Sequence, residues 1–292
     1  MARRVALLTL VAALVSCRDA PRRTSNREPA LRPLTAEATS ALVAPGFGDA
    51  VVVAPVGATR PMPVVVAVLG IGDTPEGQCN AWRSIVEGRA FVVCPRGRPN
   101  VVQEEGAQRD EGDPVSSRSA REEVATKIAT ASSTPKVNGF FPSDVAALEA
   151  EIDADLRALR ERFGRHVDDG PLLYAGFSRG AFLGATIVAN HPERFPRVIL
   201  IEGGQTPWTD EATSAFASGG GRRVIFACGQ ASCVEESAGP AQRLVGFGVP
   251  ARVLHAEGEG HGYGNRVRED VRRDFDWLVE GDPRFRQLVA SK

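Results

Sequence analysis

Short runs of apolar and β-branched residues recur along most of the chain, separated by polar segments of varying length. Each run is bounded by glycine, proline or charged residues, which is typical of strands buried on both faces of a sheet. Seven runs have this form, at 51–56, 63–70, 90–97, 172–178, 197–204, 223–230 and 251–258. The pattern therefore predicts seven buried strands.

Helical periodicity occupies stretches between the later runs. It is clearest over 143–163, where apolar residues recur at three- and four-residue steps opposite a face of Asp, Glu and Arg. These positions are Val145, Leu148, Ile152, Leu156, Leu159 and Phe163. Pro142-Ser143-Asp144 supplies a helix start. Strands that alternate with helices predict a mostly parallel sheet with helices on both faces, a three-layer α/β domain.

The segment 98–140 interrupts this rhythm. It is rich in Glu, Arg, Ser and Gly, with a weak helical suggestion only at 119–130. A connection this long inside a compact domain is usually functional or disordered. Because it follows the run 90–97, we expect it over the C-terminal end of the sheet. It is either a lid or pocket wall, or a solvated insertion with no role.

The N-terminus has the pattern of an export signal. A basic "MARR" precedes an apolar run of eleven residues, 5–15, which is too short to span a bilayer, since a span needs about 20. The run ends in Leu14-Val15-Ser16-Cys17, which resembles the lipobox of bacterial lipoproteins. In that case residues 1–16 are removed and Cys17 is lipidated. The alternative is an ordinary secretory signal with an incidental cysteine.

Both versions of the leader predict an extracytoplasmic protein. Several acyl chains on Cys17 would anchor it stably to a membrane of the bacterial envelope, facing the periplasm or the cell surface. Residues 17–44 are rich in Arg, Pro, Thr and Ser without a sustained apolar period, which predicts a flexible tether. The folded domain is then expected at 45–292.

Four further cysteines are expected in an oxidising compartment, where disulfides are favoured over metal ligands. Three pairings are possible. We favour Cys79 with Cys94 and Cys228 with Cys233, because each pair closes a short loop at the end of a predicted strand. Free buried thiols are the alternative. No histidine pair stands near them to build a zinc site, and we expect no metal or other cofactor.

The formal net charge of −1 gives no basic field that would attract nucleic acid. We therefore expect no nucleic-acid partner.

The sequence GFSRG, 176–180, carries the first candidate for chemistry. Gly-x-Ser-x-Gly alone arises readily by chance, but here it follows a predicted strand and opens a helical segment, as a nucleophile elbow requires. The serine of such a turn takes a strained backbone conformation, and larger flanking residues would collide with strand and helix. We predict that Ser178 is a nucleophile and that the Arg179 backbone N–H, at the helix N-terminus, stabilises an oxyanion. The alternative is a serine at a tight turn.

A serine hydroxyl needs an adjacent base, and the chain has four histidines. His166 lies in a polar loop, His191 at a helix end and His255 on the last predicted strand, where surface, capping and packing roles are expected. His261 follows that strand in the glycine-rich "EGEGHGYG". From there it can reach Ser178 across the C-terminal edge of the sheet.

The GFSRG elbow, the "HPERF" turn after its helix, the "GEGHGY" segment and the strand spacing together resemble the α/β-hydrolase fold family. The likeness is to its esterase and lipase-like serine hydrolases and covers about 51–278. It implies a Ser/His/acid triad that cleaves esters, or less often amides and thioesters, through an acyl-enzyme. The implied partner is a small-molecule acyl ester.

The chain departs from that family at two positions. Many members carry His-Gly after an early strand, where this chain has Leu69-Gly70-Ile71-Gly72. Because the oxyanion donor there is backbone, we carry the role over to the Ile71 N–H. The family's usual acid lies in Gly-x-x-Asp after the strand 223–230, where this chain has Gly229-Gln230-Ala231-Ser232.

Several carboxylates could replace that aspartate. Glu202 matches the site after the preceding strand that some lipases use, although it could instead cap a loop. Glu235 and Glu236 could approach His261 through a Cys228–Cys233 bridge, or they could be first-turn helix residues.

Glu257 and Glu259 flank His261 on a short loop, where we expect them to face solvent. We favour Glu202 as the acid, with Glu236 as the alternative.

Two classes of function follow. The first is an extracytoplasmic serine hydrolase acting on an ester of a small or medium acyl group, and it is favoured because elbow, histidine and chain order agree. The second is a non-catalytic hydrolase-fold lipoprotein, a binding or envelope-interaction module that kept Ser178 and His261 but lost the acid. A peptidase of the same fold is a third and weaker reading.

Overall fold

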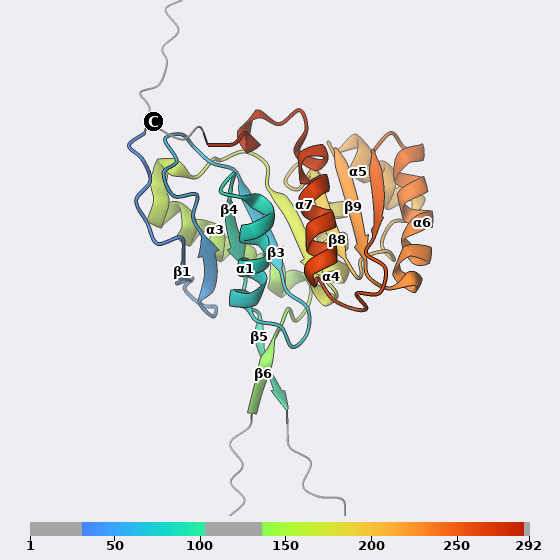
Figure 1. The fold of residues 1–292 in the computed structure, drawn as a ribbon, viewed down its shortest axis with the longest axis horizontal. Helices are drawn as coiled ribbons and strands as arrows, with labels where there is room; N and C mark the ends of the chain where they lie inside the picture. The colour runs from blue at the N-terminus through green and yellow to red at the C-terminus, as the bar shows by residue number, and fades with distance from the viewer. Residues whose placement is uncertain (1–30, 103–135, 289–292) are drawn as a thin grey trace, which may run out of the picture. The chain divides into compact units, whose positions relative to one another are not determined.

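The computed structural model describes residues 31–102 and 136–288 of the chain. Eight of the described strands form one sheet in the order β1-β2-β4-β3-β7-β8-β9-β10 (Figure 1). Strand β2 is antiparallel to both β1 and β4, and every other neighbouring pair is parallel. The strands are β1 Thr39–Leu42, β2 Ala50–Val53, β3 Val64–Val68, β4 Phe91–Cys94, β7 Leu173–Phe177, β8 Arg197–Ile201, β9 Arg223–Cys228 and β10 Ala251–His255.

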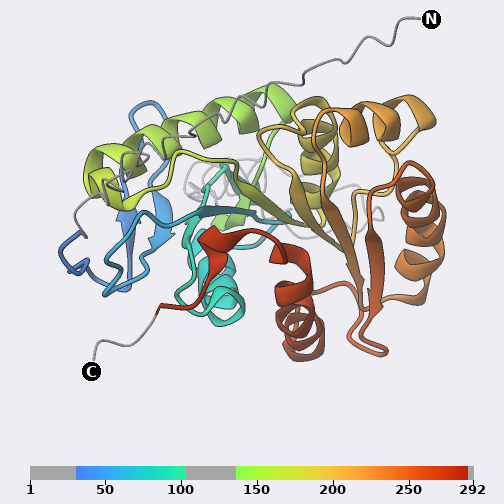
Figure 2. The ribbon, with the colours of Figure 1, turned by 90° about the horizontal axis from the view of Figure 1, so that it is seen from above.

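Helices cover both faces of the sheet, as Figure 2 shows from above. Apolar residues of α1 and α7 pack on one face, and those of α3, α4, α5 and α6 pack on the other. These helices are α1 Pro75–Val86, α3 Val145–Phe163, α4 Arg179–Asn190, α5 Asp210–Ser218, α6 Ala231–Gly246 and α7 Asn265–Val279. The predicted three-layer α/β architecture is confirmed, including the start of α3, where Asp144 caps the helix by accepting from the Ala147 N–H at 2.9 Å.

Register brings the ends of the central strands together. Phe177 of β7 lies beside Ile201 of β8, and Ile201 lies beside Ala227 of β9. The residues that follow these strands, Ser178 and Glu202 among them, therefore leave the sheet at neighbouring points of one edge. This is the edge at which parallel α/β sheets place their ligand sites.

All seven predicted strands are present, and the structure adds three more. Strands β5 Arg98–Val102 and β6 Lys136–Phe141 form an antiparallel ribbon that projects from the domain (Figure 1). They lie in the predicted insertion and were missed because the ribbon is largely exposed, with Val101 and Val137 each about half exposed. The weak helical suggestion at 119–130 lies outside the described residues. A lid or wall function for this insertion stays a prediction.

The folded part begins earlier than the predicted residue 45. Residues 31–44, assigned to the tether, include β1, and Leu34, Leu42 and Ala44 are buried. Isolated apolar positions in a Pro- and Thr-rich stretch gave no periodic signal, although they anchor the segment on the sheet. Cys17 and the leader lie outside the described residues. Among the helices that the structure describes, none is long and apolar enough to cross a membrane.

Two disulfides staple elements to the sheet. Cys79 of α1 bonds to Cys94 at the end of β4, and Cys228 at the end of β9 bonds to Cys233 in the first turn of α6. These are the pairings that the sequence predicted. All four cysteines are buried.

Candidate functional site

Ser178 stands at a sharp turn between β7 and α4. Its backbone has φ 51° and ψ −115°, a conformation that costs an L-residue about 1–3 kcal/mol and persists only where the surroundings enforce it. A Cβ on Gly176 would lie 2.6 Å from the Gly180 carbonyl oxygen, and a Cβ on Gly180 would lie 2.6 Å from that of Leu69. Both glycines are therefore sterically required, and the predicted elbow is present.

His261 meets the serine at the edge of the sheet. Its Nε2 lies 2.9 Å from Ser178 Oγ, and its side chain is 48% exposed. The histidine is carried by the loop after β10, in which Gly258 and Gly260 take positive φ values of 84° and 68°. Glycine tolerates this conformation, so the loop can turn back over the sheet.

Glu202 completes the chain of contacts on the far side of the imidazole. It follows β8, its side chain is 1% exposed, and its Oε2 lies 3.2 Å from His261 Nδ1. A carboxylate only accepts hydrogen bonds, so Nδ1 carries the proton. Nε2 is then free to accept the Ser178 hydroxyl proton.

The N-terminus of α6 holds the other oxygen of Glu202. Oε1 accepts the backbone N–H of Gly229 and, at 3.0 Å, that of Gln230. Helix N-termini attract negative charge because their first N–H groups have no partner within the helix. Backbone N–H groups thus hold one oxygen of the buried Glu202 while its second oxygen faces the histidine.

The other candidate acids lie elsewhere. Glu235 and Glu236 are exposed on α6, which matches their alternative reading as helix residues. Glu257 is exposed, and Glu259 pairs with Arg266 at 3.9 Å. Of the carboxylates weighed from the sequence, Glu202 is the one in contact with His261.

The loop after β3 runs directly against the elbow. A Cβ on Gly70 would lie 3.1 Å from the Ser178 Cβ and 2.8 Å from the Phe177 ring, so the backbone leading to Ile71 is close to the serine. The Gly72 N–H donates to the Phe140 carbonyl at 2.9 Å and is engaged there. Arg179 is the first residue of α4, which places its backbone N–H at the helix N-terminus.

The Arg179 side chain fixes the segment behind the elbow. Its Nε donates to the Pro142 carbonyl at 2.7 Å, and its Nη2 donates to the Ser143 carbonyl. A cavity of about 410 Å³ opens beside this segment, at the base of the β5–β6 ribbon. It is lined by Gly46, Phe47, Gly48, Arg96, Gly97, Arg98, Pro99, Phe140, Ser143, Ala147 and Glu151. Arg98, Pro99 and Phe140 of the predicted insertion line this cavity, whereas Ser178, His261 and Glu202 do not.

Two contacts near the histidine were missed from the sequence. The Tyr263 hydroxyl donates to the Asp73 carboxylate, and its ring packs edge-on against Phe177 at 4.7 Å between centroids. Burial, followed by the bond to Asp73, raises the pKa of Tyr263, which keeps the hydroxyl protonated. The contact ties the histidine loop to the loop after β3. An aromatic residue two positions after His261 was the available signal.

The second missed contact is Gln230, whose Oε1 lies 3.2 Å from His261 Nδ1. Part of the Gly229–Ser232 segment where the family has its acid therefore does face the histidine, through an amide oxygen. The sequence offered no sign of this, because the distance depends on how β9 ends and α6 begins.

The remaining histidines lie away from Ser178. His166 Nε2 contacts the Arg32 carbonyl at 2.9 Å. His191 is the C-cap residue of α4, as expected, and its Nε2 lies 2.9 Å from a Glu149 carboxylate oxygen. His255 was expected to be packed but is exposed. The reason is that β10 lies at the edge of the sheet.

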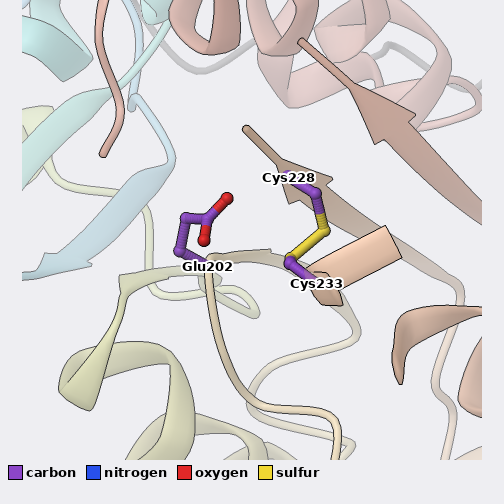
Figure 3. A group of neighbouring side chains, drawn as sticks. All are labelled: Glu202, Cys228 and Cys233. Atoms are coloured by element: carbon purple, nitrogen blue, oxygen red, sulfur yellow. A yellow bond between two sulfur atoms is a disulfide. The ribbon is translucent and has the colours of Figure 1, made fainter. Parts of the chain in front are cut away.

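Glu202, Cys228 and Cys233 form a buried cluster, and Figure 3 shows the carboxylate beside the disulfide. One donor atom from each lies within 4.8 Å of the other two, which is a spacing found in metal sites. The sulfurs are bonded to each other, however, and a metal needs thiolates. The disulfide therefore cross-links the end of β9 to α6, next to the backbone N–H groups that hold Glu202.

No family model matches the chain, and no curated protein does. Similar solved structures include TT1662 from Thermus thermophilus, at 17% identity and a TM-score of 0.52, over 83% of this chain and 98% of that one. Est1E from Butyrivibrio proteoclasticus is 10% identical with a TM-score of 0.51, over 83% and 99%. A thermostable esterase is 18% identical with a TM-score of 0.49, over 83% and 62%. The strand order, the elbow and the first two likenesses agree that the chain has the α/β-hydrolase fold.

Proposed function

We propose that this protein is a serine hydrolase that cleaves esters of small or medium acyl groups, with Ser178 as nucleophile, His261 as base and Glu202 as acid. The observation that carries the proposal is the continuous contact from Ser178 Oγ to His261, at 2.9 Å, and from His261 to the buried Glu202, at 3.2 Å. Such a serine–base–orienting acid arrangement is the general signature of an activated nucleophile.

The proposed reaction proceeds in two halves. His261 Nε2 takes the hydroxyl proton while Ser178 Oγ attacks the ester carbonyl, and the resulting oxyanion accepts hydrogen bonds from the Ile71 and Arg179 backbone N–H groups. The imidazolium then gives its proton to the leaving alcohol, which leaves an acyl-enzyme. Water, deprotonated by His261, then attacks that ester, and the imidazolium returns the proton to Ser178 Oγ as the acid is released.

Glu202 has two roles in this scheme. It holds the imidazole with the proton on Nδ1, and it stabilises the positive charge that forms on the ring. Its two backbone donors at the start of α6 keep its carboxylate in place.

The case for the non-catalytic alternative rested on the missing aspartate in 229–232. The buried carboxylate that meets His261 after the neighbouring strand supports the catalytic proposal over this alternative. Nothing in the described residues favours a peptidase over an esterase.

We also propose that the protein works outside the cytoplasm, anchored through lipid on Cys17. The basic and apolar leader supports export, and two disulfides fit an oxidising compartment. Expression in a bacterial host should place the protein in the membrane fraction, with acyl chains on Cys17 detected by mass spectrometry. A Cys17→Ala variant should be released, and an unmodified wild type in the soluble fraction would contradict the anchor.

Hydrolysis of p-nitrophenyl esters of increasing chain length tests the catalytic proposal. We expect activity with acetate to octanoate esters and loss of at least about 10³-fold in kcat for Ser178→Ala and His261→Ala. The matched controls are Ser214→Ala and His255→Ala, both at exposed positions. Equal activity of Ser178→Ala and wild type would overturn the proposal.

A further inference from the structure

We propose that Gln230 is a positioning residue for His261, sharing the Nδ1 proton with Glu202; this rests on the proposed function. The Gln230 Oε1 and the Glu202 Oε2 each lie 3.2 Å from His261 Nδ1. One N–H therefore has two oxygen acceptors, one charged and one neutral. Together they fix the rotation of the ring more closely than a single acceptor would.

Gln230 also contacts Glu202 directly. Its backbone N–H donates to Glu202 Oε1 at 3.0 Å while its side chain reaches the histidine. The three residues thus form a closed set of hydrogen bonds, in which Gln230 holds both the acid and the ring that the acid orients.

The Gln230 side chain does not cap α6, although Gln230 is the N-cap residue of that helix. Gln230 is the N-cap of α6, where a capping side chain normally accepts an N–H from the first turn, but it makes no such bond. The Glu202 carboxylate occupies that end of the helix instead. The amide of Gln230 is then available to the histidine, which argues against a purely structural role.

A disulfide restrains the loop that carries Gln230. The loop follows β9 and is closed by the Cys228–Cys233 disulfide, with both sulfurs buried. Glu202 follows β8, which pairs with β9, so the segments after two adjacent strands each supply one oxygen acceptor to His261 Nδ1. It follows that a carboxylate placed at position 230 should be able to replace Glu202.

The kinetic test uses the full mature chain in four variants. Gln230→Ala should lower kcat by about fivefold to tenfold with little change in KM, as loss of one hydrogen bond to a developing charge predicts. Glu202→Gln should lower kcat by about 10³-fold to 10⁴-fold. The double variant Glu202→Gln/Gln230→Glu should then have a kcat at least about tenfold above that of Glu202→Gln, because a carboxylate again faces His261 Nδ1.

Gln230→Glu alone should move the acidic limb of the pH profile of kcat/KM upward by about one pH unit, since a second carboxylate favours the protonated ring. The charged groups around His261 that these variants leave unchanged are Glu202, Glu257 and Glu259 of its own loop, Arg266 of α7, which pairs with Glu259, and Asp73, which accepts from Tyr263. Gln242→Ala and Gln242→Glu, exposed on the same helix, are the matched controls and should behave as wild type.

A readout without catalysis separates this inference from the proposed function. In a Ser178→Ala background, the pH midpoint of the His261 ring resonances in NMR should rise with Gln230→Glu and stay constant with Gln242→Glu. An unmoved midpoint, or wild-type kcat for Gln230→Ala, would overturn the role of Gln230. A moved midpoint in a protein that hydrolyses no ester would uphold the contact and overturn the proposed function instead.

Discussion

Ser178 and Glu202 follow adjacent strands, and both have a positive backbone φ, of 51° and 52°. The two turns are also linked, because the Ser178 N–H donates to the carbonyl of Ile201, the residue before Glu202, at 2.8 Å. Left-handed φ is strained for residues with a Cβ, so both positions are held by their surroundings. The serine and the acid are thereby presented on two sides of one imidazole.

The acid can be tested by a matched pair of glutamates. Glu202→Ala should lower kcat for p-nitrophenyl butyrate by about 10³-fold or more, because the ring loses its charged partner. Glu236→Ala, at the exposed position that the sequence left as the alternative acid, should keep wild-type kcat. The reverse pattern would assign the acid to Glu236 and contradict the assignment of Glu202.

Two glycine substitutions of the same chemical kind should have opposite consequences. Gly180→Ala places a Cβ 2.6 Å from two backbone carbonyl oxygens at the end of β3, so it should destabilise the fold by about 2 kcal/mol or more and abolish esterase activity. Gly246→Ala, where a Cβ would meet nothing within 4 Å, should change the free energy of unfolding by no more than about 0.5 kcal/mol. Urea denaturation measures both. An active, stable Gly180→Ala protein would contradict the elbow geometry.

Removal of one disulfide should lower stability alone, whereas removal of the other should also lower activity. Cys79→Ser/Cys94→Ser opens a 15-residue loop and should cost about 3 kcal/mol in the free energy of unfolding while the folded protein keeps its kcat. Cys228→Ser/Cys233→Ser opens a loop of only five residues but frees the backbone that holds Glu202, so kcat should fall by about tenfold. Kinetics below the melting temperature distinguish the two. Equal kcat losses in both variants would argue against a positioning role for the second disulfide.

The features of the fold and site that could be predicted from the sequence are those set by residues close together in the chain. The elbow, its glycines, the seven apolar strands and both disulfides were predicted because each depends on residues close in sequence. Strand β1 and the β5–β6 ribbon were missed because their residues lack a continuous apolar run. Gln230 and the Tyr263–Asp73 bond were missed because they depend on where separate loops end in space, which no periodicity encodes.

Glu202 lies between these two cases. Its position after a strand made it a candidate, but only the register of β8 against β9 brings it to the N-terminus of α6 and the far side of His261. The sequence alone could not exclude Glu236, because it follows Cys233 closely and a Cys228–Cys233 bridge could bring it near His261.

A buried acid outside the site should make stability depend on pH. Asp155 of α3 is buried, and within the described part of the chain neither carboxyl oxygen has a hydrogen-bond partner. Burial, and then the nearby Glu151, raise the pKa of Asp155 to about 8. The folded state therefore keeps a proton that the unfolded chain, with a carboxyl pKa of about 3.9, releases. Stability should fall as the pH rises from about 4 to about 8.

Replacing this carboxyl should remove that dependence. Asp155→Leu should be more stable than wild type at pH 8 by about 2 kcal/mol, and its melting temperature should vary less between pH 5 and pH 8. Glu161→Leu, an exposed position on the same helix, should keep the wild-type pH dependence. A wild type whose stability rises steadily from pH 5 to pH 8 would contradict the neutral, buried form of Asp155.

The most direct test of the central claim is covalent capture of the activated serine. A fluorophosphonate probe should react with the purified protein, losing fluoride and leaving a phosphonyl group on Ser178 that peptide mass spectrometry locates. Ser178→Ala should stay unlabelled, and Ser214→Ala should label as wild type does. No adduct on the wild-type protein, or an equal adduct on Ser178→Ala, would contradict the account of Ser178 as an activated nucleophile.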